Sequence, residues 1–468
     1  MMTKLAKKTI REISDLIKTK QISPVEITED TLKQIDSYNE KINAYIKISA
    51  DEARLAAKKA EEEISHGNYR GTLHGIPMAL KDIFYFKDEI VTIGSKIHGE
   101  FVPSFDGTVI SKLKEAGAIF TGKLNLHEYA WGATTNNPHY GACRNPWNVD
   151  NVPGGSSGGS GAAVAGDMTI ASLGTDTGGS IRIPAALCGI VGLKPTYGRV
   201  SKHGCFPLCW TLDHIGPMTK TVEDAAILLE YIAGYDINDS TSINTPVETY
   251  TEHVSAGVKN IVIGIEEDYF FKNIDSEVNR LVRKAISSLE EMGAKVEIIS
   301  IPSMNKLLYA QSITMLTEAS AVHHQNLRLR PQDFGEDVRM VLELGEIPSA
   351  VDYLEAQELR TQFQLEFKKV FEKIDVLISP TLPFVSSRID SGHVIINGRE
   401  EKFSENVSRL TRPGNFLGYP AISIPCGLSN GLPVGMQIMG APFKESTILR
   451  VAGALEKTNP LMGLRPNL

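Results

Sequence analysis

Hydrophobic residues near the start of the chain recur every three or four positions, a spacing that predicts amphipathic helices. The first predicted helix carries Leu5, Ile10, Ile13 and Ile17 on its apolar face. A second helix is expected to begin at Ser23, because Pro24 and Glu26 after a serine supply a first-turn proline and a capping box. A third helix, rich in alanine and glutamate, is expected from about residue 51 to Gly67. Residues 1–70 are therefore predicted to form a helical flank.

From Gly75 onward, short apolar runs alternate with amphipathic segments, a pattern typical of α/β folds. The expected strands cover residues 76–80, 118–122, 168–173, 261–265, 295–299, 376–379, 421–424 and 434–439. The expected helical segments cover residues 109–116, 222–233 and 275–292, together with a helix-rich insert at residues 304–374. Residues 71–220 are expected to form the core segment that carries the chemistry. Because no repeat or linker divides the chain, residues 1–468 are predicted to form one α/β domain, a mixed central β-sheet flanked by α-helices.

The charge balance disfavours nucleic acid and membrane surfaces as partners. The chain has 468 residues with 48 Lys+Arg against 56 Asp+Glu, a formal net charge of −8, so it lacks a basic footprint. No apolar run approaches the roughly 18 residues of a membrane span, and residues 1–20 contain no apolar core typical of a signal peptide. A small-molecule substrate is expected instead, and a homodimer is left open.

The five cysteines are an odd number and are scattered along the chain, which favours a reducing, cytoplasmic environment. Cys205 and Cys209, with His203 and His214 nearby, raise the idea of a zinc site. A structural zinc site needs four well-spaced ligands, and no second cysteine pair is present. No metal site is therefore predicted.

Glycine and serine gather in two loops, PGGSSGGSG at residues 153–161 and GTDTGGS at residues 174–180. Of the 40 glycines, 11 lie between Gly154 and Gly192. Glycine permits tight turns and lets a ligand approach the backbone. Such loops can therefore present N–H groups to an anion or to a developing oxyanion.

Two familiar glycine motifs do not fit these loops. A phosphate-binding P-loop would need a lysine near its end, and no lysine lies between Asn151 and Arg182. A dinucleotide fingerprint would need a third small residue where Val164 stands.

Two routes to a serine nucleophile remain. Residues 155–159 match the G-x-S-x-G nucleophile elbow, which would need a downstream histidine, and His393 is the one histidine in residues 325–468. That interpretation leaves the second serine loop unexplained. Alternatively, a buried neutral lysine can take the proton of a serine, since burial lowers a lysine pKa. Lys81 is the candidate, because it ends the apolar run GIPMALKD at residues 75–82.

At this point the sequence resembles the amidase signature family. The motifs that carry the resemblance are GIPMALKD (75–82), GKLNLHE (122–128), YGACRNPWN (140–148), PGGSSGGSG (153–161), DTGGSIR (176–182), GLKPTYGR (192–199), PGN (413–415), PAISIP (420–425) and GLPVGMQ (431–437). They span most of the chain from about residue 70. The resemblance implies a Ser–cis-Ser–Lys amide hydrolase that forms an acyl-enzyme and needs no metal or organic cofactor.

The resemblance also implies roles for individual residues. Ser180 would be the nucleophile, Ser156 the bridging serine in a cis peptide, and Lys81 the base. The oxyanion would be held by backbone N–H groups, those of Thr177, Gly178, Gly179 and Ser180. Asp176 and Arg182 are expected to form a buried structural pair, and Ser157 to support its loop by hydrogen bonding.

The family contains free amidases and also the A subunit of the tRNA-dependent amidotransferase, which hydrolyses glutamine and passes ammonia to a partner. That subunit usually has DEFAMG where this chain has HEYAWG at residues 127–132, and an acidic residue before the closing Pro-x-Asn. Here Arg409 and Arg412 precede Pro413 and would repel an ammonium group. These departures favour a stand-alone amidase, and the glutamine-hydrolysing subunit is the alternative.

The expected substrates are small amides, anilides, carbamates or esters. Tyr129 and Trp131 lie where the family lines its acyl pocket, and a large indole would narrow that pocket. The alternative is that both aromatic side chains pack in the core.

Overall fold

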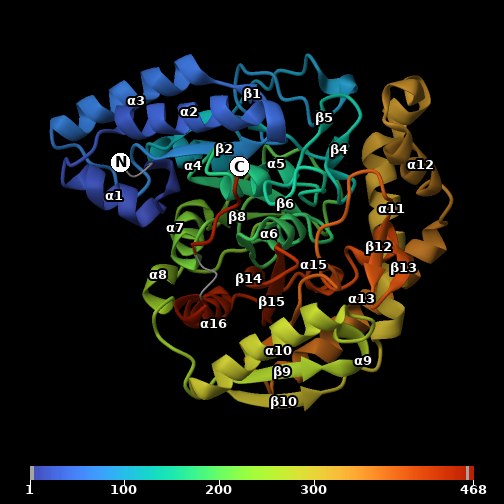
Figure 1. The fold of residues 1–468 in the computed structure, drawn as a ribbon. Helices are drawn as coiled ribbons and strands as arrows, with labels where there is room; N and C mark the ends of the chain where they lie inside the picture. Colours follow the sequence, from blue (N-terminus) through green and yellow to red (C-terminus); the bar gives the residue numbers. More distant parts are fainter. Residues whose placement is uncertain (1–4, 460–462) are drawn as a thin grey trace.

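The computed structural model describes residues 5–459 and 463–468. Its centre is one mixed sheet of 11 strands between helical layers, as predicted (Figure 1). In spatial order the strands are β1 (Tyr45–Ile48), β3 (Ile119–Leu124), β2 (Pro77–Lys81), β6 (Ala171–Asp176), β8 (His214–Thr219), β7 (Val191–Lys194), β14 (Ala421–Ser429), β15 (Leu432–Gly440), β11 (Val376–Pro380), β9 (Val262–Glu266) and β10 (Lys295–Ile299). Strand β2 is parallel to β3 and β6, and β9 is parallel to β10 and β11, whereas the other neighbours are antiparallel.

Helices flank this sheet along the whole chain. They are α1 (Ile10–Lys18), α2 (Pro24–Ile42), α3 (Ala50–Ser65), α4 (Thr108–Glu115), α5 (Gly158–Ala165), α6 (Arg182–Cys188), α7 (Val222–Ile232), α8 (Tyr250–His253), α9 (Glu267–Phe270), α10 (Ser276–Glu291), α14 (Phe403–Asn406), α15 (Arg412–Leu417) and α16 (Glu445–Thr458). The helix-rich insert consists of α11 (Met304–Leu329), α12 (Glu336–Leu344) and α13 (Ala350–Val370). These three helices pack together along one side of the molecule (Figure 1).

Local sequence signals explain where several helices begin. Ser23 accepts a hydrogen bond from the Glu26 backbone, and the Glu26 side chain accepts one from the Ser23 backbone, so the predicted capping box at the start of α2 is confirmed. Within the predicted helical flank, however, β1 forms the edge strand of the sheet, antiparallel to β3. A four-residue strand between two helices is too short for a periodicity signal.

Helix α5 was not predicted, because glycine and serine have low helix propensity. Its residues are all buried, and their small size is what close packing needs. A Cβ added to Gly159 would lie 2.4 Å from the carbonyl oxygen of Asn125 and 2.6 Å from that of Ala44. These residues therefore form a helix because it packs closely against neighbouring backbone, although their local helix propensity is low.

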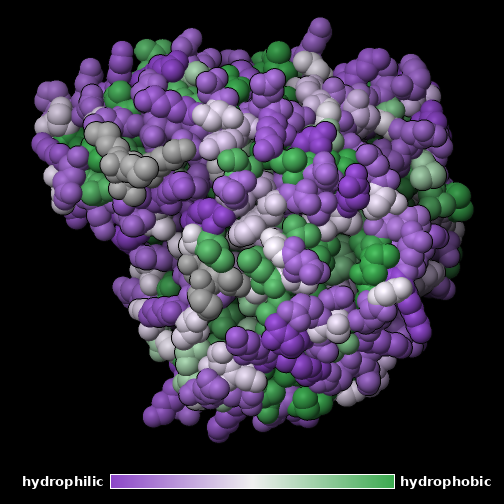
Figure 2. All heavy atoms as spheres, viewed as in Figure 1, coloured by the Kyte–Doolittle hydropathy of each residue, from purple (hydrophilic) through white to green (hydrophobic). Residues whose placement is uncertain are grey.

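Two small antiparallel sheets lie outside the main one. They are β4 (Asn136–Asn137) with β5 (Gly141–Ala142), and β12 (His393–Ile396) with β13 (Arg399–Lys402). The surface shown in Figure 2 is mainly hydrophilic, with hydrophobic side chains gathered near its centre. Among the described helices, none combines the length and the apolar character that crossing a bilayer requires.

The sheet order brings the glycine-rich loops to one edge. Strands β2 and β6 are parallel neighbours, so Lys81 at the end of β2 lies beside the loop that follows β6. The carboxyl ends of parallel strands are the usual place for a ligand site in α/β proteins. The fold therefore places the lysine next to both serine loops.

Candidate active site

Lys81 lies at the centre of the candidate site. Its side chain is only 1% exposed, and Nζ donates hydrogen bonds to Ser156 Oγ and Thr175 Oγ1, each at 2.7 Å. Burial lowers the pKa of Lys81 to about 7, and the nearby Asp213 and Asp176 offset only part of this effect. A lysine in this state can accept a proton near neutral pH.

The two serine loops are tied to each other at the same place. The Gly155–Ser156 peptide bond is cis, as the family resemblance implied. The Ser157 backbone donates to the Ser180 carbonyl at 3.3 Å, and the Ser157 hydroxyl donates to the Thr175 carbonyl at 3.2 Å. Ser157 thus supports the loops by hydrogen bonding, as expected.

Ser156 and Ser180 differ in their exposure. Ser156 is fully buried, whereas Ser180 is 9% exposed and lines a cavity. Within the described residues, no hydrogen bond joins the two hydroxyl groups, and Ser180 Oγ has no protein partner. The Ser180 hydroxyl is therefore open toward the cavity, while Ser156 is held by Lys81.

The loop after β6 presents N–H groups, but one of the four implied oxyanion donors is already used. The Gly179 N–H donates to Asp176 Oδ1 at 2.8 Å. This corrects the expectation for Gly179, because a carboxylate three residues earlier takes that donor. The N–H groups of Thr177, Gly178 and Ser180 have no partner in the described part of the chain, so these three remain as the candidate oxyanion hole.

Asp176 and Arg182 form the buried pair that was expected. Both side chains are fully buried, with two N···O distances of 3.0 Å. Arg182 also donates to Asn415 Oδ1 at 2.7 Å and to Gln437 Oε1 at 3.1 Å. Burial alone would raise the pKa of Asp176, but Arg182, Lys194 and Asn415 hold it below its ordinary range. The network anchors the start of the loop after β6 (residues 177–180), which is called the oxyanion loop below.

A second carboxylate supports the same loop from the other side. Asp213 Oδ1 accepts a hydrogen bond from Thr177 Oγ1 at 2.5 Å, and Asp213 Oδ2 accepts from the Leu208 and Cys209 backbones. Burial raises the pKa of Asp213. The loop is thus held by Asp176 at one end and through Thr177 at the other.

The cavity at Ser180 has a volume of about 450 Å³. Its walls come from the loop after β6, from α11 and α12 of the insert, and from the start of α15. Trp131 is half-buried and lines this cavity. Tyr129 does not line it, since its ring is fully buried and its hydroxyl lies 2.8 Å from His98 Nδ1. Of the two aromatic candidates, only Trp131 faces the space where a substrate would bind.

The charged groups of the cavity differ from the sequence-based expectation. Arg412 lines the cavity, but Arg409 does not, because its guanidinium donates to the carbonyls of Tyr269 and Lys272. Asp337 on α12, which the sequence reasoning missed, also lines the cavity and lies 2.9 Å from His127 Nε2. The cavity therefore holds both a guanidinium and a carboxylate, and the charge argument against an ammonium-bearing substrate does not hold.

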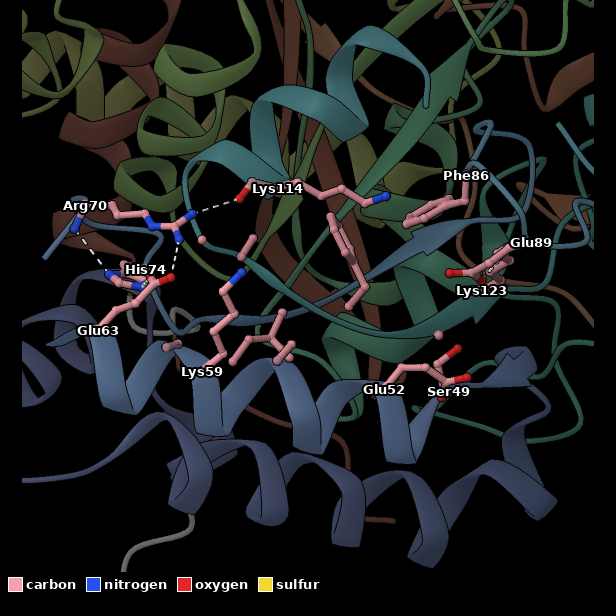
Figure 3. A pocket seen from close by; sticks show the side chains of 17 residues that line it. Ser49, Glu52, Lys59, Glu63, Arg70, His74, Phe86, Glu89, Lys114 and Lys123 are labelled. Carbon is pink, nitrogen blue, oxygen red and sulfur yellow. Dashed lines mark hydrogen bonds and ion pairs between the residues drawn. The ribbon is translucent and has the colours of Figure 1, made fainter. Parts of the chain in front are cut away.

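A separate cavity of about 360 Å³ lies between α3, α4 and β3, and none of the predicted catalytic residues lines it (Figure 3). Several of its charged side chains pair with one another. Glu63 lies 2.6 Å from Arg70 and 3.1 Å from His74, and Glu89 lies 3.3 Å from Lys123. We find no nucleophile and base in contact there.

The sequence raised two other kinds of site, a zinc site at Cys205 and Cys209 and a serine activated by His393. Cys209 Sγ lies 3.0 Å from the buried carboxylate of Glu318, and within residues 5–459 and 463–468 no three His, Cys, Asp or Glu side chains are arranged to hold a metal ion. His393 is exposed on β12 and bonds to Ser391, and it does not line the Ser180 cavity.

Thr175, Asp213 and Asp337 are the site residues that sequence reasoning missed. Thr175 could have been found from its place in the second serine loop, once β2 and β6 are known to be neighbours. Asp213 and Asp337 come from distant segments without a motif, so no local signal points to them.

Comparisons with known proteins agree with this site. A family model described as Amidase matches residues 26–449. The chain is 40% identical over 479 residues to the A subunit of glutamyl-tRNA(Gln) amidotransferase from Geotalea daltonii, with 96% of each chain covered. Relatives with this name do not support the preference for a stand-alone amidase.

Solved structures give the same family. One, described as an unexpected vestigial protein complex that reveals the origins of an s-triazine catabolic enzyme, shares 32% identity and a TM-score of 0.94, covering 98% of this chain and 100% of that one. A bacterial aryl acylamidase shares 30% identity and a TM-score of 0.88, covering 97% and 96%. With most of its length matched by the family model and by such relatives, the chain belongs to the amidase signature family of amide-hydrolysing enzymes.

Proposed function

We propose that Ser180 attacks the carbonyl carbon of an amide and forms an acyl-enzyme, with Lys81 as base and Ser156 as the bridging group. The observation that carries this proposal is the contact between buried Lys81 and the Ser156 hydroxyl, 2.7 Å long, beside the loop that bears Ser180. Family membership supports the same chemistry.

In this mechanism neutral Lys81 accepts the proton of Ser156 Oγ, while Ser156 accepts that of Ser180 as it attacks. The tetrahedral oxyanion is stabilised by the free N–H groups of Thr177, Gly178 and Ser180, each such donor being worth about 3 kcal/mol. Ser156 then protonates the leaving nitrogen, and the amine or ammonia departs. Water attacks the acyl-enzyme along the reverse proton path and releases the acid.

For the finer assignment we favour a glutamine-hydrolysing subunit of an amidotransferase over a stand-alone amidase. Full-length relatives at about 40% identity carry that name, and the cavity offers Arg412 and Asp337 to the two charges of an amino acid. Assembly with partner subunits is part of this proposal. A cytoplasmic location is proposed as well, supported by five free cysteines.

A stand-alone amidase for short amides, anilides, carbamates or esters is the second candidate. The aryl acylamidase and the peptide amidase among the structural neighbours favour it. A self-sufficient enzyme would turn over one of these substrates without any partner, alone or as a homodimer.

The test is a substrate panel on the purified chain, with ammonia or amine release as the readout. The panel contains glutamine, short aliphatic amides, an anilide and ethyl carbamate. Ser180→Ala, Ser156→Ala and Lys81→Ala are each expected to lower kcat by several orders of magnitude, with non-additive losses. Ser160→Ala is the matched control, because within the described residues the hydroxyl of this serine of the same motif has the Leu173 carbonyl as its one hydrogen-bond partner. Turnover that survives Ser180→Ala would overturn the proposal.

The same panel separates the two finer assignments. A preference for glutamine over every other amide supports the subunit, whereas faster hydrolysis of an anilide or a simple aliphatic amide supports the stand-alone enzyme. Size-exclusion chromatography with light scattering then tells a monomer from a homodimer.

A further inference from the structure

We propose that Arg412 binds a carboxylate on the acyl chain of the substrate, so that the enzyme acts on monoamides of short dicarboxylic acids. This inference rests on the proposed function and adds the substrate class. Glutamine is one member of the class, since it is such a monoamide with an added ammonium group.

Arg412 lies in the Ser180 cavity, close to the loop that bears Ser180. Arg412 and Ser180 line the same cavity. A Cβ placed on Gly178 would lie 3.9 Å from Arg412 Cγ, so the arginine side chain runs directly beside the oxyanion loop. Thr411 Oγ1 donates to the Gly178 carbonyl at 2.6 Å, which ties the start of α15 to this loop. A substrate bound at Ser180 therefore has the guanidinium within its cavity.

Arg412 has hydrogen-bond partners but no counter-ion among the described residues. Arg412 Nε donates to Ser408 Oγ at 2.9 Å and Nη1 donates to Ser312 Oγ at 3.1 Å, and both partners are neutral. Among the described residues no carboxylate lies within 4.0 Å of this guanidinium, whereas the buried Arg182 has one at 3.0 Å. Arg412 is half-buried, and a partly desolvated guanidinium is better stabilised with an anion than without one; burial also lowers the pKa of Arg412. A substrate carboxylate would supply the absent partner with bidentate geometry.

Other polar and apolar side chains lie near the Arg412 guanidinium and the loop at Gly178. Asp337, the carboxylate of the cavity, lies 2.9 Å from His127 Nε2 and is not the counter-ion of Arg412. Gln311 on α11 is fully buried, its amide has no partner within the described residues, and its Nε2 lies 4.0 Å from a Cβ placed on Gly178. Apolar side chains of α11, Met315 and Leu316, also line the cavity. A substrate with an amide, a short apolar chain and a terminal carboxylate would match the Ser180 loop, the apolar side chains and the guanidinium that share this cavity.

The experiment compares glutaramate with pentanamide, which has the same carbon count and a methyl group in place of the carboxylate. For the wild-type enzyme, kcat/KM for glutaramate is expected to exceed kcat/KM for pentanamide by about 100-fold. This factor corresponds to the free energy of one hydrogen-bonded ion pair. Arg412→Met should reduce this preference to within a few-fold, mainly through KM, while the hydrolysis of pentanamide persists. Arg412→Lys should give an intermediate ratio. A purely structural role for Arg412 would lower the turnover of both substrates alike and would overturn the proposal.

Arg409→Met is the matched control, because this neighbouring arginine points away from the cavity. It should leave the ratio of kcat/KM for glutaramate to kcat/KM for pentanamide unchanged.

A second experiment measures binding without turnover. Isothermal titration calorimetry compares the binding of glutarate to the Ser180→Ala protein with its binding to the Ser180→Ala/Arg412→Met protein. About 10- to 100-fold weaker binding in the double variant supports the subsite, and equal binding overturns it. Pentanamide hydrolysis as fast as that of glutaramate overturns the subsite and leaves the Ser180 mechanism standing, whereas glutarate binding without any Ser180-dependent turnover overturns the mechanism alone.

Discussion

At the residue scale, Lys81 shows how burial prepares a base. Its side chain has two hydroxyl partners and no carboxylate partner within salt-bridge distance in the described residues. Removing a lysine from water favours its neutral form. Burial destabilises the ammonium form of Lys81, and this is what would allow Lys81 to accept a proton from Ser156 in the proposed mechanism.

This state predicts a pH profile. Because the pKa of Lys81 is lowered to about 7 and the base must be neutral, kcat/KM should rise about tenfold per pH unit below pH 7 and level off above it. Measuring kcat/KM from pH 5 to 9 with one unionised amide checks this. A rate that falls as the pH rises through 7 would contradict the role of Lys81 as base.

Thr175 is predicted to position Lys81. Thr175→Val keeps the shape of the side chain but removes the 2.7 Å hydrogen bond, so kcat should fall by about 10- to 100-fold. Since that bond stabilises the ammonium, its loss should also move the midpoint of the pH profile downward. Thr175→Ser should restore both values. An unchanged midpoint would show that the threonine only fills space.

At the element scale, helices and loops outside the sheet form the walls of the cavity at Ser180. Helices α11 and α12 form one wall, and the loop that carries Trp131 forms another. The helix-rich insert therefore forms part of the wall of the candidate site. Its role in selecting the acyl group depends on how these helices pack against the oxyanion loop.

Trp131 is predicted to limit the length of the acyl chain. Trp131→Ala opens the cavity, so the kcat/KM ratio of hexanamide to propanamide should rise by about 10-fold, in line with the worth of buried methylenes. A series of aliphatic amides measures this ratio. Trp210→Ala serves as control, because Trp210 is 44% exposed and lies outside the Ser180 cavity. If both variants keep the ratio of wild type, Trp131 does not shape the pocket.

At the scale of the whole molecule, Arg182 joins distant parts of the chain. It contacts Asp176 at the end of β6, Asn415 on α15 and Gln437 on β15. These contacts span up to 255 residues in sequence. The same network holds the oxyanion loop, so global stability and the geometry of the site share one set of hydrogen bonds.

Asp176→Asn is predicted to destabilise the whole fold by about 3–5 kcal/mol, since it leaves the buried Arg182 without a counter-charge. Urea unfolding followed by circular dichroism measures the loss. Because the pKa of Asp176 is held below its ordinary value, this stability is present above about pH 4 and is lost as the pH falls further. Glu277→Gln, which removes an exposed ion pair with Arg280, should leave the unfolding midpoint unchanged. Equal midpoints for both variants would contradict the prediction.

The family, the α/β architecture and the grouping of Lys81 with the two serine loops follow from the sequence, because glycine-rich turns, strand ends and helix caps are local signals. The capping box at Ser23 is one example that needs only four residues. Prediction from local helix propensity was wrong where packing overrides that propensity, as in the glycine-rich helix α5.

The tertiary structure alone decided which groups face the cavity. Arg409 and Arg412 are three residues apart, yet one bonds to distant carbonyls and the other lines the cavity beside Gly178. Asp337 comes from a helix more than 150 residues away from the serine loops, and the Gly179 donor is taken by Asp176. Side-chain direction and donor availability depend on neighbours from other parts of the chain, and a linear motif carries no information about those neighbours.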